Sequence, residues 1–374
     1  MRIDETLRPA GLLPALTRVW EVSAGKIDSV LRTCPPEQAS PVFTVEGRYT
    51  ARGWTEWTRG FQYGSALLQF DATGEKRFLT AGRELTLTAM ASHLTHTGVH
   101  DHGFNNVSTY GNLWRLAGEG RVDPDPSYAL ALQVSGAVQA SRWQTTADGG
   151  GYIYSFNGPH SLFVDTIRSC RALALAHQLG QVLQGEHDER ISLLDRLYTH
   201  ALTTARWNIY YGRGRDSYDV RGRTAHESIF NVRDGRYRCP STQQGYSPFS
   251  TWTRGLSWAV LGYPELLEWM AAHPQFQPEP EVREEMLAAA TATCDFYLEH
   301  TAADGIPYWD TGAPGLAALG DWRDRPADPY NPHEPVDSSA AAIAAQGLLR
   351  LGRYLGVAPG QAGHKYWQAG LTVA

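Results

Sequence analysis

The chain has 374 residues, of which 42% are apolar and 19% are charged, a composition that fits a globular protein with a large core and argues against disorder. Its 33 basic and 39 acidic residues give a net charge of −6, which excludes a broadly basic nucleic-acid-binding protein. No segment approaches the run of about 18 apolar residues that a membrane span needs, so we expect no membrane association.

The cysteines and the first residues bear on metal content and location. Cys34, Cys170, Cys239 and Cys294 show neither CxxC nor Cys/His spacing, so we expect no metal site, and they are too few for a disulfide scaffold. The first residues lack an apolar signal region, which predicts a cytoplasmic protein. A periplasmic or secreted protein with its signal peptide removed would look the same.

Apolar residues recur at helical spacing in most segments. Helices are predicted over about 10–33, 56–70, 75–94, 104–117, 126–143, 163–182, 186–207 and 249–272, then through the 280s and 290s, and finally after Asp337. The last of these begins at Asp337-Ser338-Ser339, which is typical of a helix N-cap. Glycine-rich and proline-rich breaks separate these segments.

The fold class follows from this succession of helices. There is no alternation of strands and helices, which excludes an α/β fold, and no sequence repeat of fixed period, which disfavours an open solenoid. We therefore predict an all-α toroid that forms one domain over residues 1–374.

Residues 208–248 depart from the helical pattern and are predicted to form a long arginine-rich loop. Between residues 206 and 238 the arginines are Arg206, Arg213, Arg215, Arg221, Arg223, Arg233, Arg236 and Arg238, and the acids are Asp216, Asp219, Glu227 and Asp234. In an acidic protein this local excess suits an anionic ligand. A solvated loop with scattered ion pairs is an equal alternative.

Two aspartates lie in segments where polar residues interrupt aromatic and glycine-containing runs. Asp165 follows Leu162-Phe163-Val164 and begins a helical run, so on its own it is best read as an N-cap. The alternative is a proton donor whose pKa is raised by apolar neighbours. Asp101 stands between two histidines in HDHGF, either as a structural turn residue or as a presented carboxylate.

Five motifs in one order carry a family resemblance. They are WTRGFQYG (57–64), HDHGF (100–104), FVDT (163–166), TQQGYSPFSTWTRGLSW (242–258), and the pair IPYWDTGAPG and DSSAAAIAAQGLL in the C-terminal part. Together they resemble the unsaturated glucuronyl hydrolases, glycoside hydrolase family 88, over about residues 57–355. The resemblance implies an (α/α)6 barrel, a six-hairpin toroid. The family normally continues beyond HKYWQAGLTVA with a final helix, so two alternatives are open: a barrel one helix short, or a barrel closed by a partner.

The resemblance also implies residue roles. Asp165 matches the general acid/base, and Asp101 matches the second carboxylate, which orients the ring hydroxyls. The substrate-binding residues that it implies are Trp57, as a stacking platform, His226, Gln244, Trp252, Arg254 and Trp258. For Trp258, core packing is the alternative. Asp337 is expected to cap a helix, and Asp310 to hold a loop by hydrogen bonds.

The implied reaction is the hydration of an unsaturated uronic acid at the non-reducing end of an oligosaccharide. Protonation of C4 of the vinyl ether makes C5 electrophilic, water adds there, and the resulting hemiketal opens and releases the neighbouring sugar. One carboxyl group serves as general acid and then as base, with no metal or cofactor. The expected partner is thus a small anionic oligosaccharide, bound by a monomer or homodimer.

Two other functions remain open at this stage. A sugar epimerase or isomerase on the same barrel would use histidine pairs, for which His100, His102 and His226 are candidates. A degenerate, non-catalytic sugar-binding barrel is the other. The family usually has an apolar residue at the position of His102, and this extra imidazole beside Asp101 is expected to influence the pH optimum or subsite preference.

Overall fold

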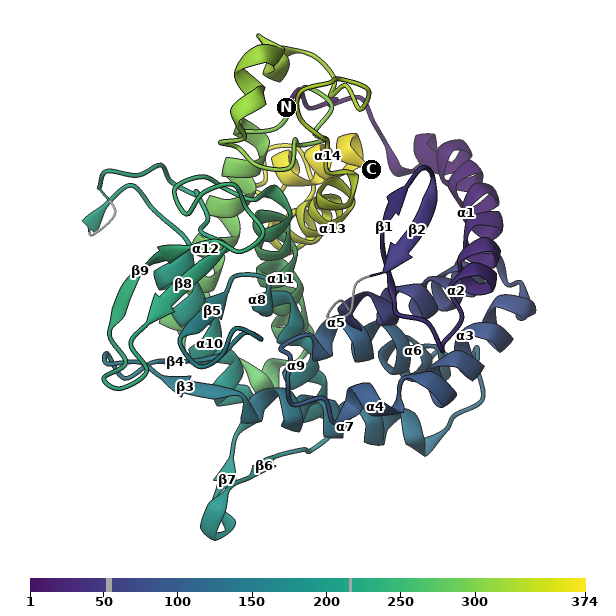
Figure 1. Ribbon diagram of the computed structural model, residues 1–374, viewed down its shortest axis with the longest axis vertical. Coiled ribbons are helices and arrows are strands. Elements are labelled where there is room, and N and C mark those ends of the chain that lie inside the picture. The colour runs from purple at the N-terminus through teal and green to yellow at the C-terminus, as the bar shows by residue number, and fades with distance from the viewer. Residues whose placement is uncertain (52–55, 215–216) are drawn as a thin grey trace. The chain divides into compact units, whose positions relative to one another are not determined.

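Helices dominate the computed structural model, which describes residues 1–51, 56–214 and 217–374 (Figure 1). The chain forms two compact units. The larger unit comprises Met1–Pro9, Trp143–Cys170 and Leu194–Ala374, and the smaller unit comprises Ala10–Arg142 and Arg171–Leu193. The expected single catalytic domain over 1–374 stays a prediction beside this division.

The smaller unit is built mainly of helices. They are α1 (Leu13–Thr33), α2 (Arg59–Thr73), α3 (Lys76–Ala89), α4 (Ala91–Leu94), α5 (His102–Asn106), α6 (Asn112–Gly118), α7 (Pro126–Ser141) and α9 (Arg171–Gln178), with the 3-10 turns η1 (Pro9–Leu12), η2 (Glu56–Thr58) and η4 (Glu186–Asp188) and the π turn η3 (Val107–Gly111). Its strand pairs are β1 (Pro41–Val45) with β2 (Arg48–Ala51) and β6 (Leu183–Gln184) with β7 (Arg190–Ile191). Its core gathers Tyr63, Leu67, Leu113, Tyr128 and Leu132.

Local signals set the ends of these helices. Helix α7 begins where Asp125 accepts a hydrogen bond from the Ser127 amide at 2.9 Å, with Pro126 in the first turn. Helix α2 ends at Gly74, whose φ of 75° is readily adopted only by glycine and whose N–H donates to the Phe70 carbonyl. Both ends therefore use ordinary helix-capping chemistry.

The larger unit combines helices with short strands. Its helices are α8 (Thr166–Ser169), α10 (Leu193–Asn208), α11 (Thr253–Ala272), α12 (Pro280–Glu299), α13 (Ser338–Leu355) and α14 (His364–Val373), with the 3-10 turns η6 (Pro274–Phe276), η7 (Pro314–Leu319) and η8 (Trp322–Asp324). Its strands are β3 (Trp143–Thr145), β4 (Gly151–Ile153), β5 (Ser161–Phe163), β8 (Glu227–Phe230) and β9 (Tyr237–Ser241). Helix α11 packs against α8, α12 and α13.

A glycine allows the closest of these helix contacts. A Cβ at Gly347 of α13 would lie 2.1 Å from the Val260 carbonyl oxygen of α11, so no larger residue fits there without moving a helix. The packing of α11 against α13 therefore depends on backbone proximity as well as on apolar side chains.

A three-stranded antiparallel sheet carries the segments of greatest interest. Its order is β5-β8-β9, with Phe163 opposite Glu227 and Glu227 opposite Ser241. Strands β8 and β9 lie within the predicted loop 208–248, so that segment is not without regular structure. The sheet brings the FVDT motif beside the segment around His226, far away in the sequence.

Most predicted helices are confirmed, and three begin several residues later than predicted. The helix expected at 249–272 begins at Thr253, after the N-cap residue Trp252. The helix expected at 163–182 begins only at Thr166 and divides at Cys170, because Phe163 belongs to β5. The helix expected at 186–207 begins at Leu193, because His187 and Asp188 have positive φ angles of 55° and 60° that no helix accommodates. No helix among the described residues is long and apolar enough to cross a membrane.

Candidate active site

Asp165 lies in the larger unit between the end of β5 and the start of α8. It occupies the N-cap position of α8, but its side chain makes no capping hydrogen bond. Asp165 therefore lies at the predicted N-cap position, but its carboxyl group does not cap the helix. The side chain is buried, and its backbone carbonyl accepts a hydrogen bond from the Arg168 amide at 3.0 Å.

The structure brings His226 next to Asp165 along the sheet. The Val164 amide donates to the His226 carbonyl at 2.9 Å, which continues the pairing of β5 with β8 up to the residue before Asp165. The buried His226 ring lies 4.4 Å from the Phe163 ring and 4.8 Å from the Trp252 ring, between centroids. Two motifs some 60 residues apart thus meet at one edge of the sheet.

The protonation pattern of His226 is set by its surroundings. Its Nδ1 accepts hydrogen bonds from the backbone amides of Gln243 and Gln244, at 3.2 and 3.4 Å. A nitrogen that accepts cannot carry the hydrogen, so neutral His226 holds its hydrogen on Nε2, which is then a donor. Gln244, a predicted substrate contact, is thereby placed beside His226 through its backbone.

Trp252 and Arg254 stand at the start of α11. Trp252 is the N-cap residue and is buried, and a Cβ at Gly255 would lie 2.8 Å from its ring and 3.4 Å from Val164. Trp252 thus packs close to the segment that carries Asp165. The Arg254 guanidinium carbon lies 5.5 Å from the centre of the Trp252 ring.

Arg254 is held by an acidic partner at the start of α13. Its Nε donates to Asp337 Oδ2 at 3.0 Å, and its side chain is 33% exposed. Asp337 Oδ1 accepts from the Ala340 amide at 2.9 Å, so Asp337 is confirmed as a helix cap. Arg254 is therefore fixed at one edge and remains partly open to solvent.

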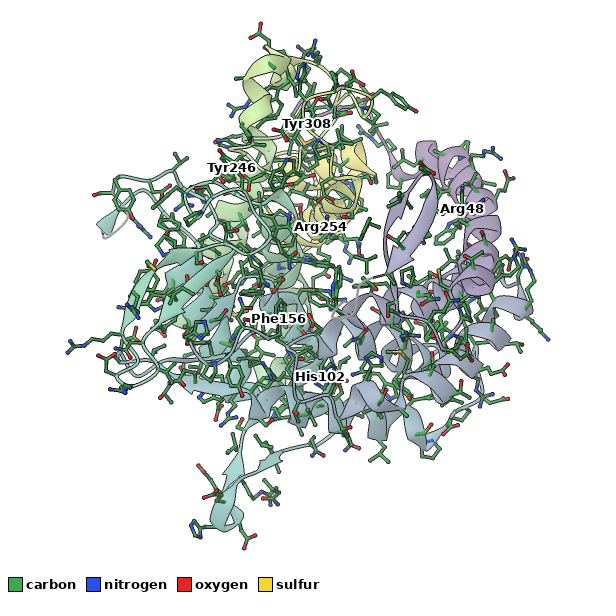
Figure 2. The ribbon with its side chains drawn as sticks, in the orientation of Figure 1. Arg48, His102, Phe156, Tyr246, Arg254 and Tyr308 are labelled. Atoms are coloured by element: carbon green, nitrogen blue, oxygen red, sulfur yellow. The ribbon has the colours of Figure 1, made fainter. Side chains whose placement is uncertain are left out.

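Asp310 and Trp258, which the sequence also singles out, are both buried. The buried Asp310 accepts from the Tyr246 amide at 2.9 Å and from the Gly312 amide at 2.8 Å, which confirms that it holds loops together. Trp258 lies one turn after Arg254 on α11 and is 7% exposed. Figure 2 places Tyr246, Arg254 and Phe156 among the side chains of this unit.

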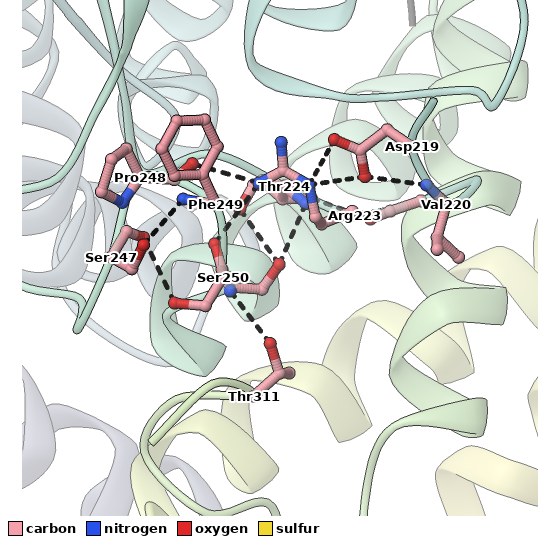
Figure 3. Close-up of polar contacts among 11 residues, drawn as sticks. Asp219, Val220, Arg223, Thr224, Ser247, Pro248, Phe249, Ser250 and Thr311 are labelled. Carbon is pink, nitrogen blue, oxygen red and sulfur yellow. Dashed lines mark hydrogen bonds and ion pairs between the residues drawn. The ribbon is translucent and has the colours of Figure 1, made fainter. Parts of the chain in front are cut away.

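The arginine-rich segment uses several of its guanidinium groups internally. The buried Arg223 binds both carboxylate oxygens of Asp219 at 2.7 and 2.8 Å and donates to the carbonyls of Pro248 and Ser250 (Figure 3). Its guanidinium carbon lies 3.9 Å from the centre of the Tyr210 ring. This ties the start of the segment to the loop before Trp252.

Other arginines of the segment also pair with acids. Arg221 binds Asp295 at 2.7 Å, and Arg206 binds Asp148 at 2.5 Å. The interpretation as scattered ion pairs therefore holds for Arg206, Arg221 and Arg223, and a role in anion binding stays a prediction for the exposed Arg213, Arg233, Arg236 and Arg238. Arg215 and Asp216 lie outside the described residues.

Asp101 belongs to the smaller unit, at the start of α5. Its side chain is 7% exposed and makes no capping hydrogen bond, and its Oδ1 lies 3.7 Å from His100 Nε2. Its backbone carbonyl accepts from the Phe104 and Asn105 amides, at 2.9 and 3.0 Å. Backbone hydrogen bonds therefore hold this tight turn, and the Asp101 carboxyl takes no part in them.

His102 is a packing residue. Its Nδ1 lies 3.1 Å from Ser135 Oγ and its Nε2 lies 3.0 Å from the His96 carbonyl oxygen. Burial lowers the pKa of His102 to about 4, so the ring is neutral at ordinary pH. This imidazole is desolvated and bonded to two partners, so it adds no charge beside Asp101 near neutral pH. Its influence on the pH optimum or subsite preference stays a prediction.

Trp57 lies in η2, near α5 of the same unit. Its ring is 6.1 Å from that of Phe61 and 6.4 Å from that of Phe104, between centroids. The start of α2 approaches α5 closely: Gly60 N donates to Asn105 Oδ1 at 2.9 Å, and a Cβ at Gly60 would lie 2.3 Å from Asn105 Cα. Trp57 is thus anchored next to the helix that Asp101 begins.

Sequence reasoning missed Glu227, which follows His226 in the chain, and its partner Asn157. Glu227 is buried and accepts hydrogen bonds from Ser161 Oγ and from Asn157 Nδ2, at 2.5 and 3.1 Å. A signal was present, because Glu227 is an acidic residue at the start of the short apolar run ESIF.

Among the described residues, no group of three His, Cys, Asp or Glu side chains is arranged to hold a metal ion.

Comparison with known proteins finds relatives along most of the chain. An unsaturated glucuronyl hydrolase of Formosa agariphila is 27% identical over 303 residues, which are 80% of this chain and 64% of that protein. One of Bacillus sp. strain GL1 is 25% identical over 317 residues, 82% of this chain and 70% of that protein. The chain thus spans slightly less than two thirds of the Formosa protein. No protein-family model matches it.

A solved structure shows a similar fold. The crystal structure of an unsaturated glucuronyl hydrolase specific for heparin matches with a TM-score of 0.72 at 22% identity, over 96% of this chain and 82% of that one. This confirms the predicted fold class, an all-α (α/α)6 barrel. The resemblance first indicated by the motifs holds in sequence and in fold, and the chain is a relative of the unsaturated glucuronyl hydrolases.

Proposed function

We propose that the protein hydrolyses oligosaccharides that carry an unsaturated uronic acid at the non-reducing end, with Asp165 as general acid and base. The observation that supports this most is the arrangement around Asp165 in the larger unit. A buried carboxyl that caps no helix is joined by backbone pairing to His226, and the Trp252 ring packs against both segments.

Each step of the reaction has a fitting group. The Asp165 carboxyl gives its proton to C4 of the vinyl ether, which leaves an oxocarbenium-like centre at C5. The resulting carboxylate then takes a proton from water as its oxygen adds to C5. The hemiketal so formed opens and releases the next sugar. This requires a protonated Asp165 at the start, which a buried site favours.

The binding residues divide between recognition of charge and of shape. The His226 Nε2–H and the partly exposed Arg254 supply donors for the carboxylate and hydroxyl oxygens of an anionic sugar. Gln244 and Trp252 border the His226 ring. From the resemblance, Asp101 orients ring hydroxyls and Trp57 provides a stacking surface.

The substrate class comes from the relatives. Curated relatives are named unsaturated glucuronyl hydrolases, and one solved structure is of an enzyme specific for heparin. We propose unsaturated disaccharides from uronate-containing polysaccharides as substrates.

An absorbance assay tests this function. The conjugated C4=C5 double bond absorbs in the ultraviolet, so incubation with an unsaturated disaccharide should remove the absorbance. Asp165→Asn should lower the rate at least about 100-fold, because the proton donor is lost, while Asp321→Asn, at an exposed carboxylate, should leave it unchanged.

The other functions give different results in the same assay. Interconversion of a saturated sugar without loss of absorbance would indicate an epimerase. Binding without consumption would indicate a non-catalytic barrel. Equal rates for the Asp165→Asn variant and the unaltered protein would overturn the role of Asp165.

A further inference from the structure

A buried carboxylate that the proposed reaction does not use lies next to His226. Glu227 is 4% exposed, and its Oε1 accepts from Ser161 Oγ at 2.5 Å and from Asn157 Nδ2 at 3.1 Å. A carboxylate buried in this way is costly unless hydrogen bonds stabilise it. The hydrogen bonds that hold Glu227 beside His226 therefore need a physical account.

Asn157 is the branch point of the hydrogen bonds around Glu227. Its Nδ2 donates both to Glu227 Oε1 and to Gln243 Oε1, the latter at 3.0 Å, which uses both hydrogens of the amide group. Its backbone N donates to Ser155 Oγ, which lies 2.6 Å from Ser161 Oγ. The β4–β5 loop is thereby fixed to Glu227 and reaches Gln243.

Gln243 connects this network to the His226 ring. Its side chain accepts from Asn157, and its backbone N–H donates to His226 Nδ1. The turn is also held from within, because Gly245 N donates to Thr242 Oγ1 at 2.8 Å. A Cβ at Gly245 would lie 2.9 Å from Trp252 Cβ, so the turn has little space in which to shift.

We propose that Glu227, Asn157 and Gln243 form a positioning chain that keeps the His226 hydrogen on Nε2. This positioning chain holds the backbone amides of Gln243 and Gln244 against His226 Nδ1. Those amides exclude the tautomer with its hydrogen on Nδ1. If the turn loosens, water competes for Nδ1 and the Nε2–H donor is populated only part of the time. That His226 then binds substrate through Nε2 rests on the proposed function.

The tautomer can be measured without any substrate. In protein labelled with ¹⁵N-histidine, NMR should show His226 in the Nε2–H form alone, its signals assigned by their loss in His226→Ala. Gln243→Leu, at an exposed side chain, and Asn157→Ala should shift Nδ1 toward the average of the two tautomers. Gln144→Leu is the matched control, because the Gln144 side chain donates to the carbonyl of its own neighbour Thr145, in another strand of the unit.

Kinetics on an unsaturated disaccharide give the second measurement. Gln243→Leu should raise KM about threefold to tenfold, the effect of one hydrogen bond lost in the ground state and transition state alike. The kcat should stay within about twofold. In a His226→Ala background the same substitution should change KM no further, because the residue that it positions is absent.

The outcomes separate the positioning chain from the proposed function. If His226 stays wholly Nε2–H in Gln243→Leu and Asn157→Ala, or if Gln243→Leu raises KM equally in both backgrounds, the positioning chain is wrong. If the tautomer shifts as expected but the unaltered protein consumes no unsaturated disaccharide, the positioning chain stands and the proposed function is wrong.

Discussion

Asp337 and Asp165 each precede a helix, but their carboxyl groups differ in what they do. Asp337 precedes α13 and accepts from the Ala340 amide, so its carboxyl serves the helix. Asp165 occupies the same position before α8 and makes no such bond. Capping ties up a carboxylate and stabilises its charged form. The Asp165 carboxyl is not committed in that way, which suits a group that must carry a proton.

The titration of His102 predicts a pH dependence of stability. Burial lowers its folded-state pKa to about 4, below its ordinary value of 6.5, so the unfolded chain takes up the proton first as the pH falls. The stability due to neutral His102 is therefore complete above about pH 6.5 and is lost toward pH 4, by about 3 kcal/mol.

Denaturant unfolding measures this effect. Between pH 6.5 and 4 the free energy of unfolding should fall less steeply in His102→Gln than in the unaltered protein, with His333→Gln as a control at an exposed imidazole. Parallel curves for His102→Gln and the unaltered protein would contradict the burial argument.

The predictable part of the site came from motifs. Asp165, His226 and Gln244 could be named because their surrounding residues resemble a family, while composition and periodicity would have left Asp165 as an N-cap. The link between Glu227 and Asn157 could not be predicted, since their hydrogen bond joins residues 70 positions apart. Only the pairing of β5 with β8 brings them together.

At the scale of elements, helices followed from the sequence and strands did not. The periodic apolar stripe on α12 and the cap signal before α13 identify those helices. Strands β5 and β8 have only three and four residues, and nearly all of their side chains are buried. They therefore lack the alternation of apolar and polar residues that predicts a strand. The sequence therefore predicts a loop where the structure has strand β8.

The contact of α2 with α5 gives a prediction for one motif glycine. A Cβ at Gly60 would lie 2.3 Å from Asn105 Cα and 2.5 Å from the Asn105 carbonyl oxygen, both backbone atoms. Gly60→Ala should lower the free energy of unfolding by about 1–3 kcal/mol, because two backbones must separate. Activity should fall as well, since Trp57 is anchored at this contact.

A second glycine provides the control. A Cβ at Gly25, on α1, would meet no atom within 4 Å, so Gly25→Ala should stabilise the protein by about 0.5–1 kcal/mol. Thermal unfolding of both variants checks the pair. Similar melting temperatures for Gly60→Ala and Gly25→Ala would show that the close approach of α2 to α5 is absent.

Asp295 joins α12 to α14 and to the arginine-rich segment. Burial alone would raise the pKa of Asp295, but hydrogen bonds from Lys365, Arg221 and Tyr366 outweigh it and lower that pKa. The stability it contributes is present above its unfolded value near 3.8 and is lost as the pH falls through the lower folded value.

Removing this charge should loosen the junction. Asp295→Asn should cost about 1–2 kcal/mol at pH 7, a modest amount because Lys365 and Arg221 are about half exposed. The difference from the unaltered protein should shrink when unfolding is measured below pH 3.8. A difference that is equal at both pH values would indicate lost packing rather than lost charge.

At the scale of the whole molecule, the predicted site residues come from both units. Asp165, His226, Gln244, Trp252, Arg254 and Trp258 belong to the larger unit, and Trp57 and Asp101 to the smaller. Within each unit the motif residues gather on neighbouring elements. The solved structure with a similar fold covers 96% of the chain. The chain order of the motifs and these local arrangements agree with that fold.

The central claim is hydration of a vinyl ether, and the fate of solvent atoms tests it most directly. The reaction should be run on an unsaturated disaccharide in D₂O and the released uronic acid product analysed by NMR and mass spectrometry. Protonation at C4 predicts one deuterium bound to that carbon, and its rate of appearance should collapse in Asp165→Asn. Release of the neighbouring sugar with the double bond intact and no deuterium at C4 would contradict the account.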